Sequence, residues 1–411
     1  MKKFDIPEFY KSGIIGKIKE IRRQSDKLKR DFTATHLDLG TVEFYLARHF
    51  GFCYGVENAV EIAYKTLEEN PHKRIFLLSE MIHNPEVNAD LLSRGVKFLM
   101  DTKGNDLLDW SDLSAEDIVI VPAFGTTIDI QNRLNEIGIN PYQFDTTCPF
   151  VEKVWNRAGQ IGERGYTVVV HGKPNHEETR ATFSHSKATT PTIVLKDLKE
   201  AEKLADYIRG QRNTHEFYDD FKGQYSEGFD PEKHLLKIGV VNQTTMLASE
   251  TQEISDYLRD VIIGHYEVEG EMATERFANT RDTLCYATND NQEATYALLR
   301  EKADLAVVVG GYNSSNTSHL VELCEEKLPT YFVRSAESLL SSKEIEHYDL
   351  HQKTVKVSKN YLPEKEKTTI LLTCGASCPD AIMEKVLLKL SAFFNETKDL
   401  NEAITSLEYA K

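Results

Sequence analysis

The chain has little cysteine, little tryptophan and no long apolar run. It contains 6 cysteines and 2 tryptophans among 411 residues. So few cysteines in so long a chain argue against a disulfide framework and favour metal binding, redox chemistry or ordinary core thiols. No apolar run approaches the roughly 18 to 20 residues that a bilayer crossing needs, and the start has no apolar segment like that of a secretory signal. We therefore expect a soluble cytoplasmic protein without a membrane partner.

Basic side chains are outnumbered by acidic ones. The chain has 49 Lys and Arg against 65 Asp and Glu, which gives a formal net charge of -16 at pH 7 with His neutral. That charge repels phosphate backbones, so nucleic acid is not an expected partner, and any anionic ligand must be held by local groups. The length and the 40% hydrophobic content allow a substantial core and indicate two to four domains.

Three cysteines share one kind of position. Cys53, Cys148 and Cys285 each end a short apolar or Thr-rich segment and directly precede an amphipathic helical pattern. A thiol at a helix N-terminus faces unpaired N–H groups and the positive end of the helix dipole, which favour the thiolate that iron or zinc requires. We hypothesise that three structural units hold one metal cluster. Cys378 also precedes a proline and a helical pattern, so the pattern leaves it open as third ligand, whereas Cys324 is expected in a helix core.

Short apolar segments alternate with helical patterns, which predicts α/β units on parallel sheets. The predicted strands are Arg74–Leu78, Asp117–Val121, Thr167–Val170, Ile238–Val241, Leu305–Val309 and Thr368–Leu372. Each is followed by a loop rich in Gly, Asn, Ser, Thr or His. These loops are residues 79–84, 123–127, 171–178, 242–245, 310–316 and 373–377. Ligands of open α/β sheets bind beyond the carboxyl ends of the strands, so we expect the loops to surround one pocket.

Two of these loops offer neutral donors to an anion such as diphosphate. The run Asn313-Ser314-Ser315-Asn316 follows a predicted strand through two glycines and combines hydroxyl, amide and backbone donors. A helix N-cap accounts for one of these residues and not for all four. Ser377 ends another predicted strand in a similar Gly-Ala-Ser segment.

Other loops contain groups that suit proton transfer. His176 and Glu178 supply an imidazole for a phosphate oxygen and a carboxylate for a proton relay, although a solvated loop explains the pair equally well. His83 precedes Asn-Pro and is also typical of a plain turn. Thr244, within Asn-Gln-Thr-Thr, offers a hydroxyl to a substrate alcohol or caps the next helix.

The motifs together resemble the LytB family of 4-hydroxy-3-methylbut-2-enyl diphosphate reductases. The resemblance covers roughly residues 48 to 395, with eight motifs in register. In order, these are Gly-Phe-Cys-Tyr-Gly-Val, Ile-His-Asn, Asp-Thr-Thr-Cys-Pro, His-Glu-Glu, Asn-Gln-Thr-Thr, Cys-Tyr-Ala-Thr-Asn-Asp-Asn-Gln-Glu-Ala, Gly-Gly-Tyr-Asn-Ser-Ser-Asn and Gly-Ala-Ser-Cys-Pro-Asp.

This resemblance implies three α/β lobes in a trefoil around a central iron-sulfur cluster. The expected parts are an N-terminal extension (1–44), lobe 1 (45–147), lobe 2 (148–284, with an insertion at about 196–236), lobe 3 (285–395) and a C-terminal tail (396–411). From their composition we expect the insertion to contain helices and a mobile loop, and neither it nor the tail to take part in the chemistry.

The resemblance also implies a chemistry. Cys53, Cys148 and Cys285 match the ligands of one 4Fe-4S cluster with an open fourth iron, so the family match selects Cys285 over Cys378. The implied reaction removes the C4 hydroxyl of 4-hydroxy-3-methylbut-2-enyl diphosphate and gives isopentenyl and dimethylallyl diphosphates, the last step of the methylerythritol phosphate pathway. An open iron is both a Lewis acid for the hydroxyl and a source of electrons.

The resemblance assigns roles to other side chains and to a partner. Glu178 is expected to deliver protons with Thr244 close by, and ferredoxin or flavodoxin is the expected electron donor. The residues expected around the diphosphate are His83, His176, Ser314, Ser315, Asn316 and Ser377.

One position departs from the family pattern. Where many members have Ala-His-Gly, with a third His facing the diphosphate, this chain has Phe124 between Ala and Gly. Thr126, Thr127 and Lys173 are candidates to compensate. The long extension and the 196–236 insertion resemble the longer variety found in cyanobacteria and plastids, so a plant or algal source would place the protein in the plastid stroma.

Two other functions fit the same residues. A redox-neutral iron-sulfur hydro-lyase would also use an iron with a free site, and it would turn over without reductant. A non-catalytic iron-sulfur or zinc protein, acting as a sensor or scaffold, would be separated by colour and metal analysis.

Overall fold

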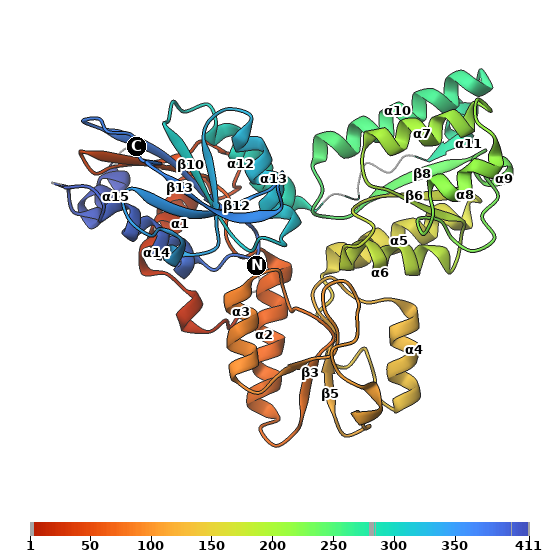
Figure 1. Cartoon of the computed structure of the whole chain (residues 1–411), viewed down its shortest axis with the longest axis horizontal. Coiled ribbons are helices and arrows are strands. Elements are labelled where there is room, and N and C mark those ends of the chain that lie inside the picture. The colour runs from red at the N-terminus through yellow and green to blue at the C-terminus, as the bar shows by residue number, and fades with distance from the viewer. Residues whose placement is uncertain (1–3, 279–282, 284, 396, 410–411) are drawn as a thin grey trace. The chain divides into compact units, whose positions relative to one another are not determined.

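The chain folds into two compact units (Figure 1). The computed structural model describes residues 4–278, 283, 285–395 and 397–409. The first unit comprises residues 1–64, 82–89 and 286–411, and the second comprises residues 65–81 and 90–285. Leu284, the residue before Cys285 in the third cysteine motif, lies outside the described residues. The division into three lobes stays a prediction.

The first unit contains a seven-stranded mixed sheet in the order β1-β2-β14-β10-β11-β12-β13. Its strands are β1 (Thr35–Asp38), β2 (Val42–Leu46), β10 (Leu305–Val309), β11 (Thr330–Val333), β12 (Glu344–Asp349), β13 (Thr354–Lys359) and β14 (Thr368–Cys374). The central strands β2, β14, β10 and β11 run parallel, which confirms the two predicted strands of this unit. The outer pairs β1–β2, β11–β12 and β12–β13 are antiparallel. The prediction of a parallel sheet is therefore correct for the central strands and wrong for the outer ones.

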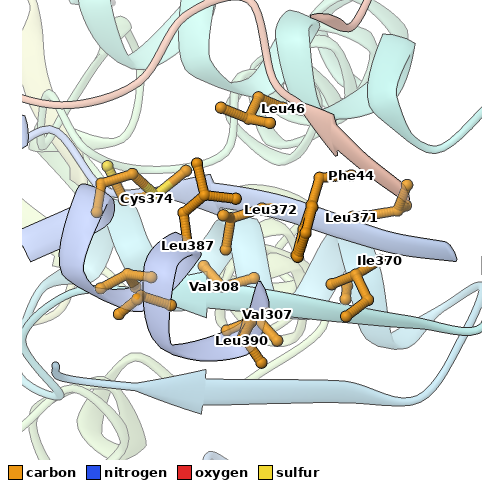
Figure 2. Close-up of a cluster of buried hydrophobic side chains, with 14 of the residues drawn as sticks. Phe44, Leu46, Val307, Val308, Ile370, Leu371, Leu372, Cys374, Leu387 and Leu390 are labelled. Carbon is orange, nitrogen blue, oxygen red and sulfur yellow. The ribbon is translucent and has the colours of Figure 1, made fainter. Parts of the chain in front are cut away.

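The core of this unit lies on the central strands. All seven residues of β14 are buried, as expected for a parallel strand that is covered on both faces. Phe44 and Val308 from the neighbouring strands and Leu387 from α14 (Asp380–Ser391) pack in the same cluster (Figure 2). Each such side chain contributes about 1.5–3 kcal/mol on burial. This rigid core fixes the carboxyl ends of β10 and β14, where two of the predicted binding loops begin.

Several helices belong wholly or partly to this unit. Their bounds are η1 Glu8–Tyr10, α1 Gly13–Ser25, α2 Tyr54–Glu69, α3 Pro85–Ser93, α12 Tyr286–Leu298, α13 Ser315–Glu325, η4 Ala336–Ser338 and α15 Leu400–Tyr409. Helix α1 begins at the cap Ser12, whose Oγ accepts from Ile15 N at 2.7 Å, and it packs against α14 and α15 (Figure 1). Within the predicted extension β1 joins the sheet, and within the predicted tail Ile404 is fully buried in the core.

The second unit contains two smaller sheets in which every pair of strands is parallel. One has the order β4-β3-β5 and the other β7-β6-β8-β9. The strands are β3 Ile75–Leu77, β4 Lys97–Phe98, β5 Ile118–Ile120, β6 Thr167–His171, β7 Thr192–Leu195, β8 Ile238–Asn242 and β9 Phe277–Ala278. The four strands predicted for this part of the chain are therefore confirmed within one or two residues at their ends.

The helices of the second unit are mostly short. They are η2 Trp110–Asp112, α4 Ile128–Ile137, α5 Pro149–Glu163, α6 Glu177–Lys187, α7 Leu198–Ile208, η3 Thr214–Glu216, α8 Phe217–Asp220, α9 Pro231–His234, α10 Ala248–Tyr266 and α11 Glu271–Arg276. Within the predicted insertion, Phe217, Phe221 and Phe229 are buried together with Ile193 and Ile238 of the adjacent strands. The insertion has the predicted helices, and its aromatic residues form part of the core of this unit.

No helix in the described part of the chain is both long enough and apolar enough to cross a membrane. Helix α10, with 19 residues, contains Glu250, Glu253, Asp256, Arg259 and Asp260.

Candidate active site

In the first unit, three loops at strand ends are joined by direct contacts. Ser377, after β14, donates from Oγ to the backbone oxygen of His83 at 3.1 Å. Gly311, after β10, packs against the same carbonyl group, and a Cβ at this position would collide with it. His83, Ser377 and Asn316 are all less than 10% exposed. The structure thus brings together the predicted residues of loops 82–84, 310–316 and 373–377.

At the start of α13, Ser314 caps the helix, whereas Ser315 and Asn316 offer donors to a ligand. Ser314 is the helix N-cap, and its Oγ accepts from Thr317 N at 3.3 Å. Ser315 and Asn316 are 4% and 3% exposed, yet the Ser315 Oγ and the Asn316 Nδ2 have no hydrogen-bond partner among the described residues. Buried polar groups in native proteins are usually satisfied, so these two atoms suit a bound ligand or water. The expectation that a cap explains only one residue of this run is confirmed.

We name the candidate anion site formed by His83, Ser315, Asn316 and Ser377 the cradle. Cys53 is connected to it through backbone hydrogen bonds. Its N–H donates to the oxygen of Ala376 at 3.2 Å, and the N–H of Ala376 donates to Asn316 Oδ1 at 2.8 Å. The oxygen of Cys53 accepts from Glu57 N at 2.9 Å, so Cys53 directly precedes the first turn of α2, as predicted. One side chain at the candidate anion site therefore fixes the turn that positions this thiol.

In the second unit, the predicted proton donor lies in a buried, oriented environment. Glu178, in the first turn of α6, is 1% exposed. Thr244, just beyond β8, donates to it twice, from the backbone N to Oε1 and from Oγ1 to Oε2 at 3.0 Å. Gln243 supports the same pair of loops, because its Oε1 accepts from Thr179 Oγ1 at 2.9 Å and from Lys173 N at 3.1 Å. The structure thus joins the two residues predicted to act together in proton transfer.

His176 is the N-cap of α6, and its Nδ1 accepts from Glu178 N at 3.2 Å. With Nδ1 as acceptor, a neutral imidazole carries its proton on Nε2 and can donate from there. The ring of Phe124 packs edge-on against His176, with centroids 5.8 Å apart. Phe124, at the position where the resemblance leads us to expect a histidine, therefore contacts the imidazole and offers no polar group of its own.

The three residues predicted as candidates to replace a histidine at position 124 have the following contacts and exposure. Thr127 is the N-cap of α4 and accepts from Ile130 N at 3.3 Å, so its hydroxyl oxygen is engaged by the helix. The backbone oxygen of Thr126 accepts from the ring of His185 at 3.1 Å. Lys173 is exposed at the end of β6.

The two remaining ligand candidates are Cys148 and Cys285. Cys148 has a backbone hydrogen bond, and a buried hydrogen bond lies two residues before Cys285. Cys148 occupies the N-cap position of α5, with Pro149 at the first helical position as predicted, and its N–H donates to Ala123 O at 3.0 Å. Just ahead of Cys285, Thr283 donates from Oγ1 to Asn242 Oδ1 at 2.6 Å. We did not predict this last contact, because the two residues are 41 positions apart and nothing in either motif indicates the other.

The six cysteines differ in burial. Cys53 and Cys148 are partly exposed and Cys285 is 8% exposed, whereas Cys324, Cys374 and Cys378 are fully buried. Burial raises the pKa of Cys324 to about 12, which suits the predicted core thiol. Among the described residues no group of three or more His, Cys, Asp or Glu side chains is arranged to hold a metal ion. Cys53 belongs to the first unit, and Cys148 and Cys285 belong to the second.

The fold is that of an α/β protein. Its candidate site has neutral donors for an anion, an oriented buried carboxylate and thiols at helix starts. This combination is suited to an enzyme. The family model of the LytB protein matches residues 44–391. The chain belongs to this family.

Several relatives are similar to this chain over most of its length. A protein of Crocosphaera subtropica named 4-hydroxy-3-methylbut-2-enyl diphosphate reductase is 40% identical over 382 residues, which cover 93% of this chain and 89% of the relative. A protein of the same name from Microcystis aeruginosa is 41% identical over 377 residues, covering 92% and 89% of the two chains. Both organisms are cyanobacteria, in keeping with the longer variety of the family that the sequence resembles.

Two solved structures share the fold. One is described as (E)-4-hydroxy-3-methyl-but-2-enyl diphosphate reductase, the terminal enzyme of the non-mevalonate pathway, with a TM-score of 0.51 and 24% identity over 87% of this chain and 99% of that chain. The other is the E-1-hydroxy-2-methyl-but-2-enyl-4-diphosphate reductase of Plasmodium falciparum, with a TM-score of 0.59 and 22% identity over 85% and 87% of the two chains. At these identities the likeness supports the mixed α/β fold.

Proposed function

We propose that this protein reduces 4-hydroxy-3-methylbut-2-enyl diphosphate to isopentenyl and dimethylallyl diphosphates, the last step of the methylerythritol phosphate pathway. The observation that carries this proposal is the family match over residues 44–391, together with relatives of that name at about 40% identity over more than nine tenths of the chain. The reaction consumes two electrons and two protons, breaks the C4–O bond and releases one water.

Three cysteines provide the donor chemistry that an iron-sulfur cofactor requires. Cys53, Cys148 and Cys285 lie next to helix starts, where helix dipoles and N–H groups favour thiolates. We assign them as the three ligands of one 4Fe-4S cluster with an open fourth iron, in a trefoil arrangement of three lobes. When bound, such a cluster supplies electrons one at a time and a Lewis-acidic site for the hydroxyl oxygen.

The first unit supplies the groups for the diphosphate. Ser315 Oγ and Asn316 Nδ2 have hydrogen-bonding capacity to spare, and the Ser377 hydroxyl and the His83 main chain form one contact beside them. Ser314 acts through the helix start that it caps. Neutral donors at a helix N-terminus bind phosphate oxygens well, which offsets the repulsion expected from the net charge of -16.

The second unit supplies the proton-transfer groups. Thr244 holds both oxygens of the Glu178 carboxyl group in fixed directions, so this group can pass a proton to a substrate placed beside it. His176 caps the same helix and presents Nε2 as a donor, which supports its assignment to the diphosphate. Loss of the C4 oxygen as water needs one proton there, and the second proton ends on carbon, where its position decides which of the two products forms.

The test is turnover under anaerobic conditions with dithionite-reduced methyl viologen and the hydroxylated diphosphate. We expect oxidation of two dye molecules per substrate and a mixture of the two products. Conversion of the substrate without any reductant would identify a hydro-lyase and overturn the reductase. A ferredoxin or flavodoxin as natural donor and a cytoplasmic or stromal location stay predictions.

A further inference from the structure

A strongly basic segment stands out in this acidic chain. Residues 16–31, which include most of α1 and the turn after it, contain seven Lys or Arg and three Asp or Glu, whereas acidic residues outnumber basic ones by 65 to 49 in the whole chain. Lys27, Lys29 and Arg30 are exposed, and Leu28 between them is 72% exposed. We name residues 27–30 the basic turn. Exposed cations of this kind attract acidic partners electrostatically.

The cations of the basic turn are available to a partner. Within α1, Lys19 pairs with Asp380 at 2.7 Å and Arg22 pairs with Asp31 at 2.9 Å. By contrast, Lys27, Lys29 and Arg30 form no ion pair with any residue that the structure describes. Burial raises the pKa of Glu57 and of Asp290, and Lys29 acts electrostatically against this rise, so the charge of this turn is offset only in part within the described chain.

A cavity connects the basic turn with a candidate cluster ligand. It has a volume of about 400 Å³ and lies within the first unit, among α1, the β2–α2 connection and the start of α12. Its lining includes the exposed Lys29 and the partly exposed Cys53. Lys29 has a left-handed backbone, with φ of 53°. Among the three thiols assigned to the cluster, Cys53 is a lining residue of this cavity.

We propose that the basic turn docks an acidic one-electron carrier protein, which reduces the cluster past Cys53. This inference rests on the proposed function, because it names the surface where the electrons enter. Each docking event oxidises one carrier by one electron and reduces the cluster by one electron, so two carriers serve one substrate. The overall negative charge of the chain works against the approach of an acidic protein, and a local cluster of exposed cations offsets this repulsion where it lies.

A small anion inside the cavity is the less favoured occupant. The acidic side chains Glu57 and Asp290 also line the cavity, and burial raises the pKa of both. The lining as a whole contains as many Asp and Glu residues as Lys and Arg residues, so the cavity offers a small anion no net positive charge, whereas Lys27 and Arg30 of the basic turn lie outside this lining.

Direct binding tests the surface independently of activity. The holoprotein is titrated with oxidised, acidic plant-type ferredoxin by isothermal calorimetry at low and at high salt. The Lys27→Glu/Lys29→Glu/Arg30→Glu variant is expected to bind on the order of tenfold more weakly at low salt, and high salt should weaken the unmodified protein more than the variant.

A matched control carries the same change in charge elsewhere. Lys302→Glu/Lys327→Glu/Lys353→Glu alters three exposed lysines of the same unit that lie outside the cavity lining, and Lys353 has the same φ of 53° as Lys29. This control should bind ferredoxin within about twofold of the unmodified protein, since rim charges act locally. Equal weakening of both variants, or of neither, would overturn the docking proposal.

Turnover separates docking from chemistry. The basic-turn variant should lose about tenfold in kcat/KM with reduced ferredoxin and retain its rate with reduced methyl viologen, because the dye needs no docking surface. Unchanged ferredoxin-driven turnover in this variant would also overturn the proposal. Absence of dye-driven turnover in the unmodified protein would instead contradict the proposed function, and the binding experiment would still decide on the surface.

Discussion

The start of α5 in the second unit and the start of α14 in the first unit share a local sequence pattern but differ in environment. Each has a cysteine followed by proline and a helix. Cys148 is partly exposed, whereas Cys378 is fully buried in the apolar core. Burial, followed by the adjacent Cys374 thiol, raises the pKa of Cys378 and keeps it protonated. A local motif thus places a thiol at a helix start, and the surrounding fold decides whether that thiol is available to a metal.

The largest effect is expected when either of these two cysteines, Cys148 or Cys378, is replaced by serine and the iron content is compared. Cys148→Ser should lose or degrade the cluster and abolish turnover, because a hydroxyl is a poor iron ligand. Cys378→Ser is the matched control and should retain its iron. Both variants are purified without oxygen and analysed for iron per chain. Greater loss of iron from Cys378→Ser than from Cys148→Ser or Cys285→Ser would show that the ligand assignment is wrong.

The next effect concerns the chemistry assigned to the second unit. Glu178→Gln should bind substrate and cluster normally and lose roughly 10²–10⁴-fold in kcat, because an amide cannot pass on the proton. Steady-state kinetics with reduced methyl viologen, together with the visible spectrum of the cluster, measure this. Normal kcat in this variant would remove Glu178 from the mechanism.

A smaller effect is expected from the cradle of the first unit. Asn316→Ala removes a buried donor to the diphosphate and a contact that fixes Ala376, so substrate affinity should fall about tenfold, for roughly 1.5 kcal/mol. The same assay should show a raised KM with a smaller change in kcat, the opposite of Glu178→Gln. A fall in kcat alone would place Asn316 with the proton-transfer groups.

The smallest effect is expected on the free energy of unfolding when Cys378 or Cys148 is replaced by alanine. Cys378→Ala removes a fully buried sulfur and should lower the free energy of unfolding by about 1 kcal/mol, since a small cavity remains. Cys148→Ala changes a partly exposed position and should alter the stability of the metal-free protein by less than about 0.5 kcal/mol. Urea denaturation of the metal-free proteins compares them, and equal losses would argue against the difference in burial.

Much of the fold could be predicted because the signals are local. The apolar run Leu305–Val309 has strand length and ends at two glycines, and it forms the predicted central strand. The antiparallel strands β12 and β13 escaped prediction, because β13 is mostly exposed and has no apolar run. The role of the 196–236 insertion in the core was missed, since its buried phenylalanines are separated by charged residues.

The candidate site could be predicted as a set of residues and only in part as a set of contacts. Family motifs indicated Glu178 and Thr244, and the structure joins them. They did not indicate that Asn316 holds the Ala376 turn, or that Phe124 packs on His176. Such contacts join positions tens of residues apart, and their geometry depends on where neighbouring strands end. Local periodicity does not contain this information.

The most direct measurement is the iron and acid-labile sulfide content of the unmodified protein, purified without oxygen and reconstituted. Three thiolates that hold one 4Fe-4S cluster predict about four iron and four sulfide per chain, with brown colour. A colourless protein that contains zinc, or one that binds neither iron nor sulfide, would contradict the assignment of Cys53, Cys148 and Cys285.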